Sequence, residues 1–180
     1  MQKHNLNFAK LLLLSAFAGS LLFSACKKDD DTEQENITRV VLHFTGDGFD
    51  QEFEWKDPDG DGGNAPTVPT LELPAGKVLD CHIHVFDDTK SPVEDLTEEI
   101  EAEGAEHLWV FESPLSNLQI EYDDQDSNGK KLGLETKWTT TTFANGVVKI
   151  TLFHEPTNKD NLSAPGGETD FTADFPVNIQ

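Results

Sequence analysis

Basic residues are scarce in this chain of 180 residues, in which Lys and Arg together number 13 against 34 Asp and Glu. The formal net charge is −21 at neutral pH. Such a charge repels nucleic-acid phosphates and anionic lipid headgroups alike. Nucleic-acid binding is therefore excluded, and the acidic excess favours either solubility alone or the capture of cations and basic partners.

Cysteine is also scarce, since Cys26 and Cys81 are the only two in the chain. A framework of several disulfides is therefore impossible, and the fold must be held by its apolar core. Cys81 lies within an alternating apolar stretch. This position predicts a buried and inert thiol rather than a reactive one.

Only one long apolar run occurs, from Leu11 to Phe23, and it is too short to span a bilayer comfortably. Two lysines precede it and the small residues Ser24 and Ala25 follow, which is the layout of a secretory signal peptide. The next residue, Cys26, makes the segment resemble the lipobox of bacterial lipoproteins, in which the thiol is acylated after the signal is removed. The alternative is an ordinary secretory peptide cleaved near Ala25.

We therefore divide the chain into a lipoprotein signal peptide (1–25), a lipidated Cys26 with a flexible acidic tether (26–36), and one domain (37–180). Acyl chains such as palmitate would hold the protein on a membrane without a transmembrane helix. The stretch Lys27-Lys28-Asp29-Asp30-Asp31 resembles the export signal of surface lipoproteins in the Bacteroidota, which implies the outer face of the outer membrane. The alternative is that these five charged residues are simply a solvated part of the tether, without a role in export.

Removal of the signal peptide leaves 155 of the 180 residues, enough for one domain with a real core. Lys3 and Lys10 leave with it, so that 11 basic residues face 34 acidic ones and the formal charge becomes −23. The acyl chains, and not electrostatic attraction, must then hold the protein at the membrane.

The mature sequence alternates in the manner of β-strands and shows no βαβ pattern. Strands are predicted at 37–44, 51–55, 78–86, 107–112, 118–122, 132–142, 147–154 and 171–179, and a short strand with its turn is predicted at 71–77. The first two should form a hairpin, Asn145-Gly146 should turn a second hairpin, and residues 93–103 favour a short acidic helix. These features predict an all-β fold, a single antiparallel immunoglobulin-like β-sandwich with one short acidic helical insertion. A small closed barrel is the alternative.

Two acidic loops are candidate calcium sites. The segment from Asp124 to Glu135 places oxygen-bearing side chains at loop positions one, three, five and twelve and glycine at position six, and its candidate ligands are Asp124, Asp126, Asn128 and Glu135. Its flanks indicate strands, so good turn chemistry is the alternative. The second loop offers Asp57, Asp59 and Asp61, but it lacks a glutamate at the twelfth place.

The histidines are candidate ligands for a transition metal such as zinc or copper. His82 and His84 share one strand face, the spacing by which one strand presents two imidazoles to one ion. His107 follows Glu103 by four residues, and His154 closes a strand. The segment from Gly166 to Asp170, which contains Glu168, supplies further oxygens. Each histidine alone is more simply a surface or satisfied residue.

Motifs of catalysis are missing. The chain contains no Gly-x-Ser-x-Gly, no phosphate-cradling glycine loop, and no serine plausibly paired with a histidine and an aspartate. We therefore expect a protein that is not an enzyme.

Three shared stretches make the chain resemble a group of small uncharacterised surface lipoproteins of the Bacteroidota. They are Asp57-Pro58-Asp59-Gly60-Asp61-Gly62-Gly63, then Glu98-Glu99-Ile100 with Glu103-Gly104 and Glu106-His107, then His154-Glu155-Pro156 with Gly166-Gly167-Glu168-Thr169-Asp170. Members are sometimes labelled as having a type 1 periplasmic-binding fold, but that fold needs two βαβ domains and a longer chain. The resemblance implies no particular activity.

The expected function is a surface-anchored, non-enzymatic binding module that captures a metal ion or small ligand for an outer-membrane transporter. An immunoglobulin-like structural or adhesion domain, whose acidic loops bind calcium for stiffness, is the alternative. A hydrolase that uses His107 or His154 is the third possibility.

Overall fold

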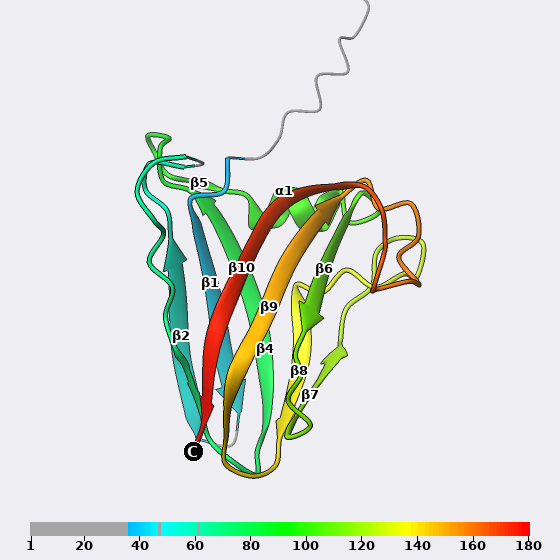
Figure 1. Ribbon diagram of the computed structural model, residues 1–180. Coiled ribbons are helices and arrows are strands. Elements are labelled where there is room, and N and C mark those ends of the chain that lie inside the picture. Colours follow the sequence, from blue (N-terminus) through cyan, green and yellow to red (C-terminus); the bar gives the residue numbers. More distant parts are fainter. Residues whose placement is uncertain (1–35, 47, 61) are drawn as a thin grey trace, which may run out of the picture. The chain divides into compact units, whose positions relative to one another are not determined.

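The structure is a computed structural model that describes residues 36–46, 48–60 and 62–180 (Figure 1). The chain divides into two units, 1–33 and 34–180, and every described residue belongs to the second. The predicted signal peptide, Cys26 and most of the tether lie outside the described residues. Within the described part of the chain, no helix is long and apolar enough to cross a membrane.

Ten strands and one short helix follow one another along the residues that the structure describes. They are β1 (Arg39–Gly46), β2 (Phe49–Lys56), β3 (Leu71–Leu73), β4 (Val78–Asp87), β5 (Glu94–Asp95), α1 (Thr97–Ala102), β6 (His107–Glu112), β7 (Leu118–Tyr122), β8 (Glu135–Thr140), β9 (Ala144–His154) and β10 (Glu168–Ile179). The predicted all-β class is confirmed by this content.

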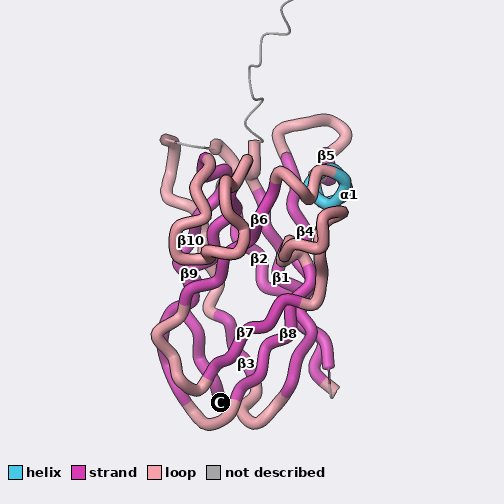
Figure 2. Tube along the Cα trace, turned by 90° about the vertical axis from the view of Figure 1, so that its right-hand side faces the viewer, coloured by secondary structure: helices cyan, strands magenta, loops and turns pink. Residues whose placement is uncertain are grey.

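The strands form two sheets that are mostly antiparallel (Figures 1 and 2). Sheet A runs in the order β2-β1-β4-β8-β7, and β5 pairs with β4. Sheet B runs in the order β3-β10-β9-β6, and its β3–β10 pair is parallel. The predicted hairpin of the first two strands is confirmed, because β1 and β2 pair antiparallel from Arg39↔Lys56 to Gly46↔Phe49.

The two sheets face one another across a shared apolar core, as in a β-sandwich. Trp55 of sheet A meets Phe171 of sheet B edge-on at 4.9 Å between ring centroids. Near the other edge, Phe111 of sheet B packs on Trp138 of sheet A at 6.0 Å. Full burial of each large apolar side chain stabilises the fold by roughly 1.5–3 kcal/mol, so these contacts hold the sheets together.

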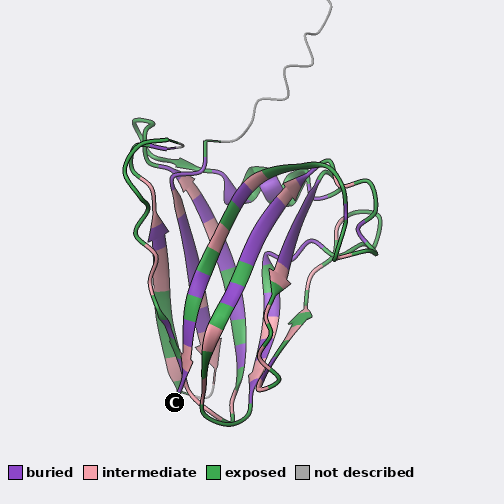
Figure 3. Ribbon diagram, in the orientation of Figure 1, coloured by how far each residue is buried: buried purple, intermediate pink, exposed green. Residues whose placement is uncertain are grey.

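Alternation along β4 shows how the sequence sets this core (Figure 3). Leu79, Cys81, Ile83 and Val85 are buried in the core, while the residues between them face outward. His82 and His84 therefore share the outer face, as predicted. Burial of the Cys81 side chain is likewise confirmed.

The hairpin predicted at Asn145-Gly146 is wrong. Both residues lie inside β9, where they pair with Asn178 and Val177 of β10. The preceding strand, β8, belongs to the other sheet, so the connection crosses between sheets instead of folding back. Gly146 serves close packing here, because a Cβ at this position would lie 2.7 Å from Leu115 Cδ2.

The short helix α1 is anchored to sheet A rather than stable by itself. Ile100 is fully buried, and the Leu96 backbone N–H donates to the Val85 carbonyl over 2.9 Å. The buried hydroxyl of Thr97 accepts the Val85 N–H, also over 2.9 Å. Because six residues form too few internal hydrogen bonds to be stable in water, these contacts with β4 hold the segment.

Candidate functional site

Two histidines lie side by side at one end of sheet B. His107 is the first residue of β6 and His154 is the last of β9, and they are direct partners in the antiparallel register. Their rings stack with 4.9 Å between centroids and 4° between planes. His107 is 1% exposed and His154 is 8% exposed, so water reaches this pair only at its edge.

The orientation of the His107 ring is set by the chain just before β6. Its Nδ1 lies 3.2 Å from the carbonyl oxygen of Glu103. A carbonyl can only accept, so Nδ1 carries the proton of this contact. The sequence placed Glu103 near His107, and the structure confirms this proximity, but through the backbone carbonyl rather than the carboxylate.

A β-bulge brings a carboxylate to the other ring. The pairing of β10 with β9 shifts register between Thr169 and Phe171, so Asp170 is the extra residue. Its side chain is only 1% exposed, and its Oδ2 lies 4.0 Å from His154 Nδ1. Bulges commonly redirect a side chain in this way, and here the result is a buried carboxylate beside an imidazole.

Three potential metal ligands converge at the outer rim of this cluster, on Glu106, His154 and Glu155. One ligand atom from each lies within 4.8 Å of the other two. The backbone fixes the approach of the two glutamates, since the Glu155 N–H donates to the Glu106 carbonyl over 2.7 Å. Glu155 also has φ of +48°, an unusual backbone conformation that persists only where its surroundings impose it.

Glycine permits the close approach of β10 to this end of β9. Gly167 has φ of +85°, and a Cβ there would overlap the His154 carbonyl oxygen and lie 2.8 Å from that of Glu155. Only glycine fits such a position without strain. The sequence of Gly166-Gly167 thus sets the position of the bulge relative to His154.

The predicted transition-metal residues fall into two separate places. His107 and His154 are adjacent, and the Cα of Glu168 pairs with that of His154 although the Glu168 side chain is exposed. His82 and His84 lie on sheet A, on its outer face, with ring centroids 4.4 Å apart. A single site built from all four histidines is therefore ruled out by the topology.

The loop predicted to bind calcium connects β7 to β8. Asp124 accepts the Gly133 and Glu135 N–H groups over 2.7 and 3.0 Å, and Asp126 accepts those of Asn128 and Lys130 over 2.8 and 2.9 Å. These carboxylates bind backbone donors in the way that stabilises turns. The calcium assignment of Asp124, Asp126, Asn128 and Glu135 stays a prediction.

Asp126 also forms a buried ion pair with a lysine side chain. Lys159 Nζ donates to its Oδ2 over 2.7 Å. Burial alone would raise the pKa of the Asp126 carboxyl, but the hydrogen bond from Lys159 and those from the backbone hold it below its ordinary value. The ammonium group therefore supplies the positive charge that this carboxylate needs.

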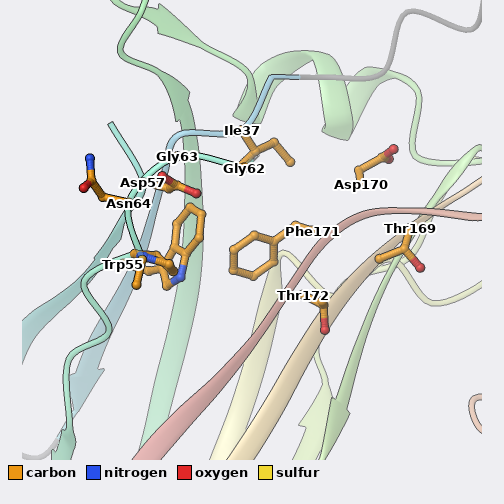
Figure 4. A pocket seen from close by; sticks show the side chains of 12 residues that line it. Ile37, Trp55, Asp57, Gly62, Gly63, Asn64, Thr169, Asp170, Phe171 and Thr172 are labelled. Atoms are coloured by element: carbon orange, nitrogen blue, oxygen red, sulfur yellow. The ribbon is translucent and has the colours of Figure 1, made fainter. Parts of the chain in front are cut away.

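The other acidic loop borders an open groove of about 640 Å³ (Figure 4). Trp55 and Phe171 form its floor, while Asp57 and Asn64 stand on the loop side and Asp170 points away from the two rings. The fully exposed Asp59 has its pKa lowered by hydrogen bonds from Asn64. Asp61 lies outside the described residues, so the trio Asp57, Asp59 and Asp61 stays a prediction.

Sequence reasoning did not select Glu106 or Glu155 as ligands, and it named Asp170 only as the end of the segment from Gly166 that supplies oxygens. Glu106 and Glu155 adjoin the two selected histidines in the chain, and this adjacency was a signal for both. Their convergence depends on the pairing of β6 with β9, which connects residues far apart in the sequence.

Comparison with known proteins gives this chain no relative from which a function can be transferred: no family model, no curated protein and no solved structure matches it.

Proposed function

We propose that this protein is a non-enzymatic binding module that holds a transition-metal ion at Glu106, His154 and Glu155. The observation that carries the proposal is the convergence of these three potential ligands within 4.8 Å. Atoms that share one ion at about 2.1 Å lie at most about 4.2 Å apart. Side-chain movements of under about 1 Å would therefore complete the coordination.

The ligand set favours zinc. One imidazole and two carboxylates are ligands that zinc commonly takes, and copper is the second candidate because imidazole suits both ions. Asp170 supports the proposal by its negative charge, since its Oδ2 lies 4.0 Å from His154 Nδ1, an ion-pair distance beyond that of a hydrogen bond. The acidic surface would further raise the local concentration of cations.

The cellular setting belongs to the same proposal. The signal peptide that directly precedes Cys26 supports a lipid anchor at the outer membrane, with the domain facing outward and delivering its ion to an outer-membrane transporter. The immunoglobulin-like type of the sandwich is also proposed, and the two facing sheets support it. The resemblance to surface lipoproteins of the Bacteroidota agrees with this setting.

Isothermal titration of the full-length protein in detergent with zinc chloride tests the proposal. We expect one equivalent to bind at this site, and His154→Ala to weaken binding there at least tenfold. The double variant Glu106→Gln with Glu155→Gln should do the same. Glu98→Gln with Glu121→Gln removes the same charge from exposed positions elsewhere, and it should leave the affinity unchanged.

Two outcomes would contradict the proposal. Zinc and copper binding that is indifferent to His154→Ala would remove this site. Binding and thermal stabilisation by calcium alone, lost with Asp124→Asn, would favour the alternative of a structural domain with calcium-stiffened loops.

A further inference from the structure

Three histidines gather on the outer face of sheet A, away from the site proposed above. His82 and His84 come from β4, and the third, His43, comes from the adjacent strand β1. His43 and His82 are direct partners in the antiparallel register. Residues opposite one another in such a pair project from the same side of the sheet, so all three imidazoles share one face.

The backbone makes the three histidines neighbours on this face, and their side chains would have to turn toward one another to share an ion, since only the Glu106, His154 and Glu155 ligand atoms already converge among the described residues. Partners across an antiparallel pair have Cα atoms about 4.5–5.5 Å apart, and residues two apart on one strand are separated by about 6.8 Å. The His82 and His84 rings approach to 4.4 Å between centroids, tilted by 39°. His43 and His82 also line one open pocket of about 480 Å³.

A carboxylate already orients the third ring. His43 Nε2 lies 2.8 Å from Asp50 Oδ1, and Asp50 belongs to β2, on the side of β1 opposite to β4. This contact occupies Nε2, so Nδ1 is the ring nitrogen of His43 that is left for a metal. Histidines that bind metals commonly donate their other N–H to a carboxylate in this manner.

We propose that His43, His82 and His84 form a second transition-metal site, open to solvent, that takes Cu²⁺ or Zn²⁺. Three imidazoles supply three of the four positions of a tetrahedral zinc shell and leave one for water or a partner's ligand. Glu52 and Glu135 flank this row, as register partners of His43 and His82, and their charges favour a cation. The inference stands independently of the proposed function.

The three rings differ in exposure, since His82 is exposed whereas His43 and His84 are half-buried. Partial burial, followed by the neighbouring His82, lowers the pKa of His84 below its ordinary value. The competing interpretation is a column of packed rings, since His84 also stacks on Phe86 at 6.5 Å.

The experiment uses the full-length protein with His154→Ala as background, so that the first site is absent. We expect calorimetry to find one equivalent of Cu²⁺, and electron paramagnetic resonance to show hyperfine splitting from three nitrogens. Adding His82→Ala and His84→Ala should abolish this binding, and adding His43→Ala should weaken it at least tenfold and leave two nitrogens. Circular dichroism checks that each variant folds. We expect that it does, because His82 is exposed and its side chain contributes little to the core.

Asp50→Asn should weaken copper binding about 10- to 100-fold, as loss of a carboxylate behind a ligand does. Asp174→Asn removes the same charge from an exposed position of sheet B and should have no effect. Absence of a bound equivalent in the His154→Ala background would overturn the inference, as would equal effects of Asp50→Asn and Asp174→Asn. A third outcome would overturn the proposed function alone. In it, the His154→Ala variant still binds copper, whereas the double variant His82→Ala with His84→Ala, which keeps His154, binds none.

Discussion

The ammonium group of Lys159 donates to the carboxylate of Asp126 over 2.7 Å, with side chains only 6% and 1% exposed. The same ammonium donates to the Gly104 carbonyl, also over 2.7 Å. One side chain thus joins three connections: the turn before β6, the β7–β8 loop and the β9–β10 loop. These are the connections that surround the His107–His154 end of sheet B.

Replacing this lysine should be costly. We expect Lys159→Met to lower the free energy of unfolding by about 3–5 kcal/mol, because the Asp126 charge would stay buried without its counterion. Denaturant titration followed by circular dichroism measures the change. Lys130→Met is the matched control, since the Lys130–Asp160 pair has side chains 46% and 71% exposed and should contribute at most about 1 kcal/mol. Equal losses in the two variants would contradict this account.

Stability should also fall in acid through Asp126. Its pKa in the folded protein lies below the value of about 3.9 expected in the unfolded chain. The stabilisation is therefore complete above about pH 4, and it is lost as pH falls through the lowered folded value. We expect the melting temperature to drop less steeply between pH 5 and pH 2 in the double variant Asp126→Asn with Lys159→Met. An unchanged slope would show that other carboxylates carry the acid transition.

Gly167 gives a prediction about the backbone beside His154. Gly167→Ala should lower the free energy of unfolding by more than the roughly 1–2 kcal/mol that a left-handed backbone costs any other residue. The excess comes from overlap of the new Cβ with the His154 carbonyl. Gly129→Ala is the control, since Gly129 has a similar φ of +73° but its nearest neighbour would be Gln125 Oε1 at 3.7 Å. If the free energy of unfolding falls equally in both variants, the close approach of β10 to β9 does not contribute to the cost of Gly167→Ala.

The thiol of Cys81 should be unreactive in the folded protein. Burial in the core raises its pKa well above the ordinary value, and the thiolate is the reactive form. We expect Ellman's reagent to label Cys81 only after unfolding in guanidinium, at the rate of unfolding. Rapid labelling of the native protein would show that the core opens at β4.

Alternation in the sequence was enough to predict the local structure of the strands and their inner faces. Leu79, Cys81, Ile83 and Val85 lie in the core as expected, because an apolar residue at every second position can bury only one face. The same rule placed His82 and His84 together on the outer face. The local pattern therefore predicted which face of each strand is buried, but not which strands lie next to one another.

Pairing between distant strands could not be predicted in this way. His43 faces outward by the same alternation, yet only the pairing of β1 with β4 brings it beside His82. The hairpin signal of Asn145-Gly146 failed for the converse reason. Although a tight turn suits the local chain there, the burial of β8 and β9 in opposite sheets outweighs this preference.

The bulge at Asp170 interrupts the alternation of inward and outward side chains in β10, so the two parts of the strand follow different phases. One phase governs residues 168–169, and another begins at Phe171 and directs Phe171, Phe175 and Val177 into the core. Loss of Asp170 would merge the two phases, and Glu168, Thr169 and the core residues would all keep their facing, because each already lies opposite its own partner on β9. The His154 end of the strand can therefore gain or lose a residue, and so change its chemistry, without any rearrangement of the core.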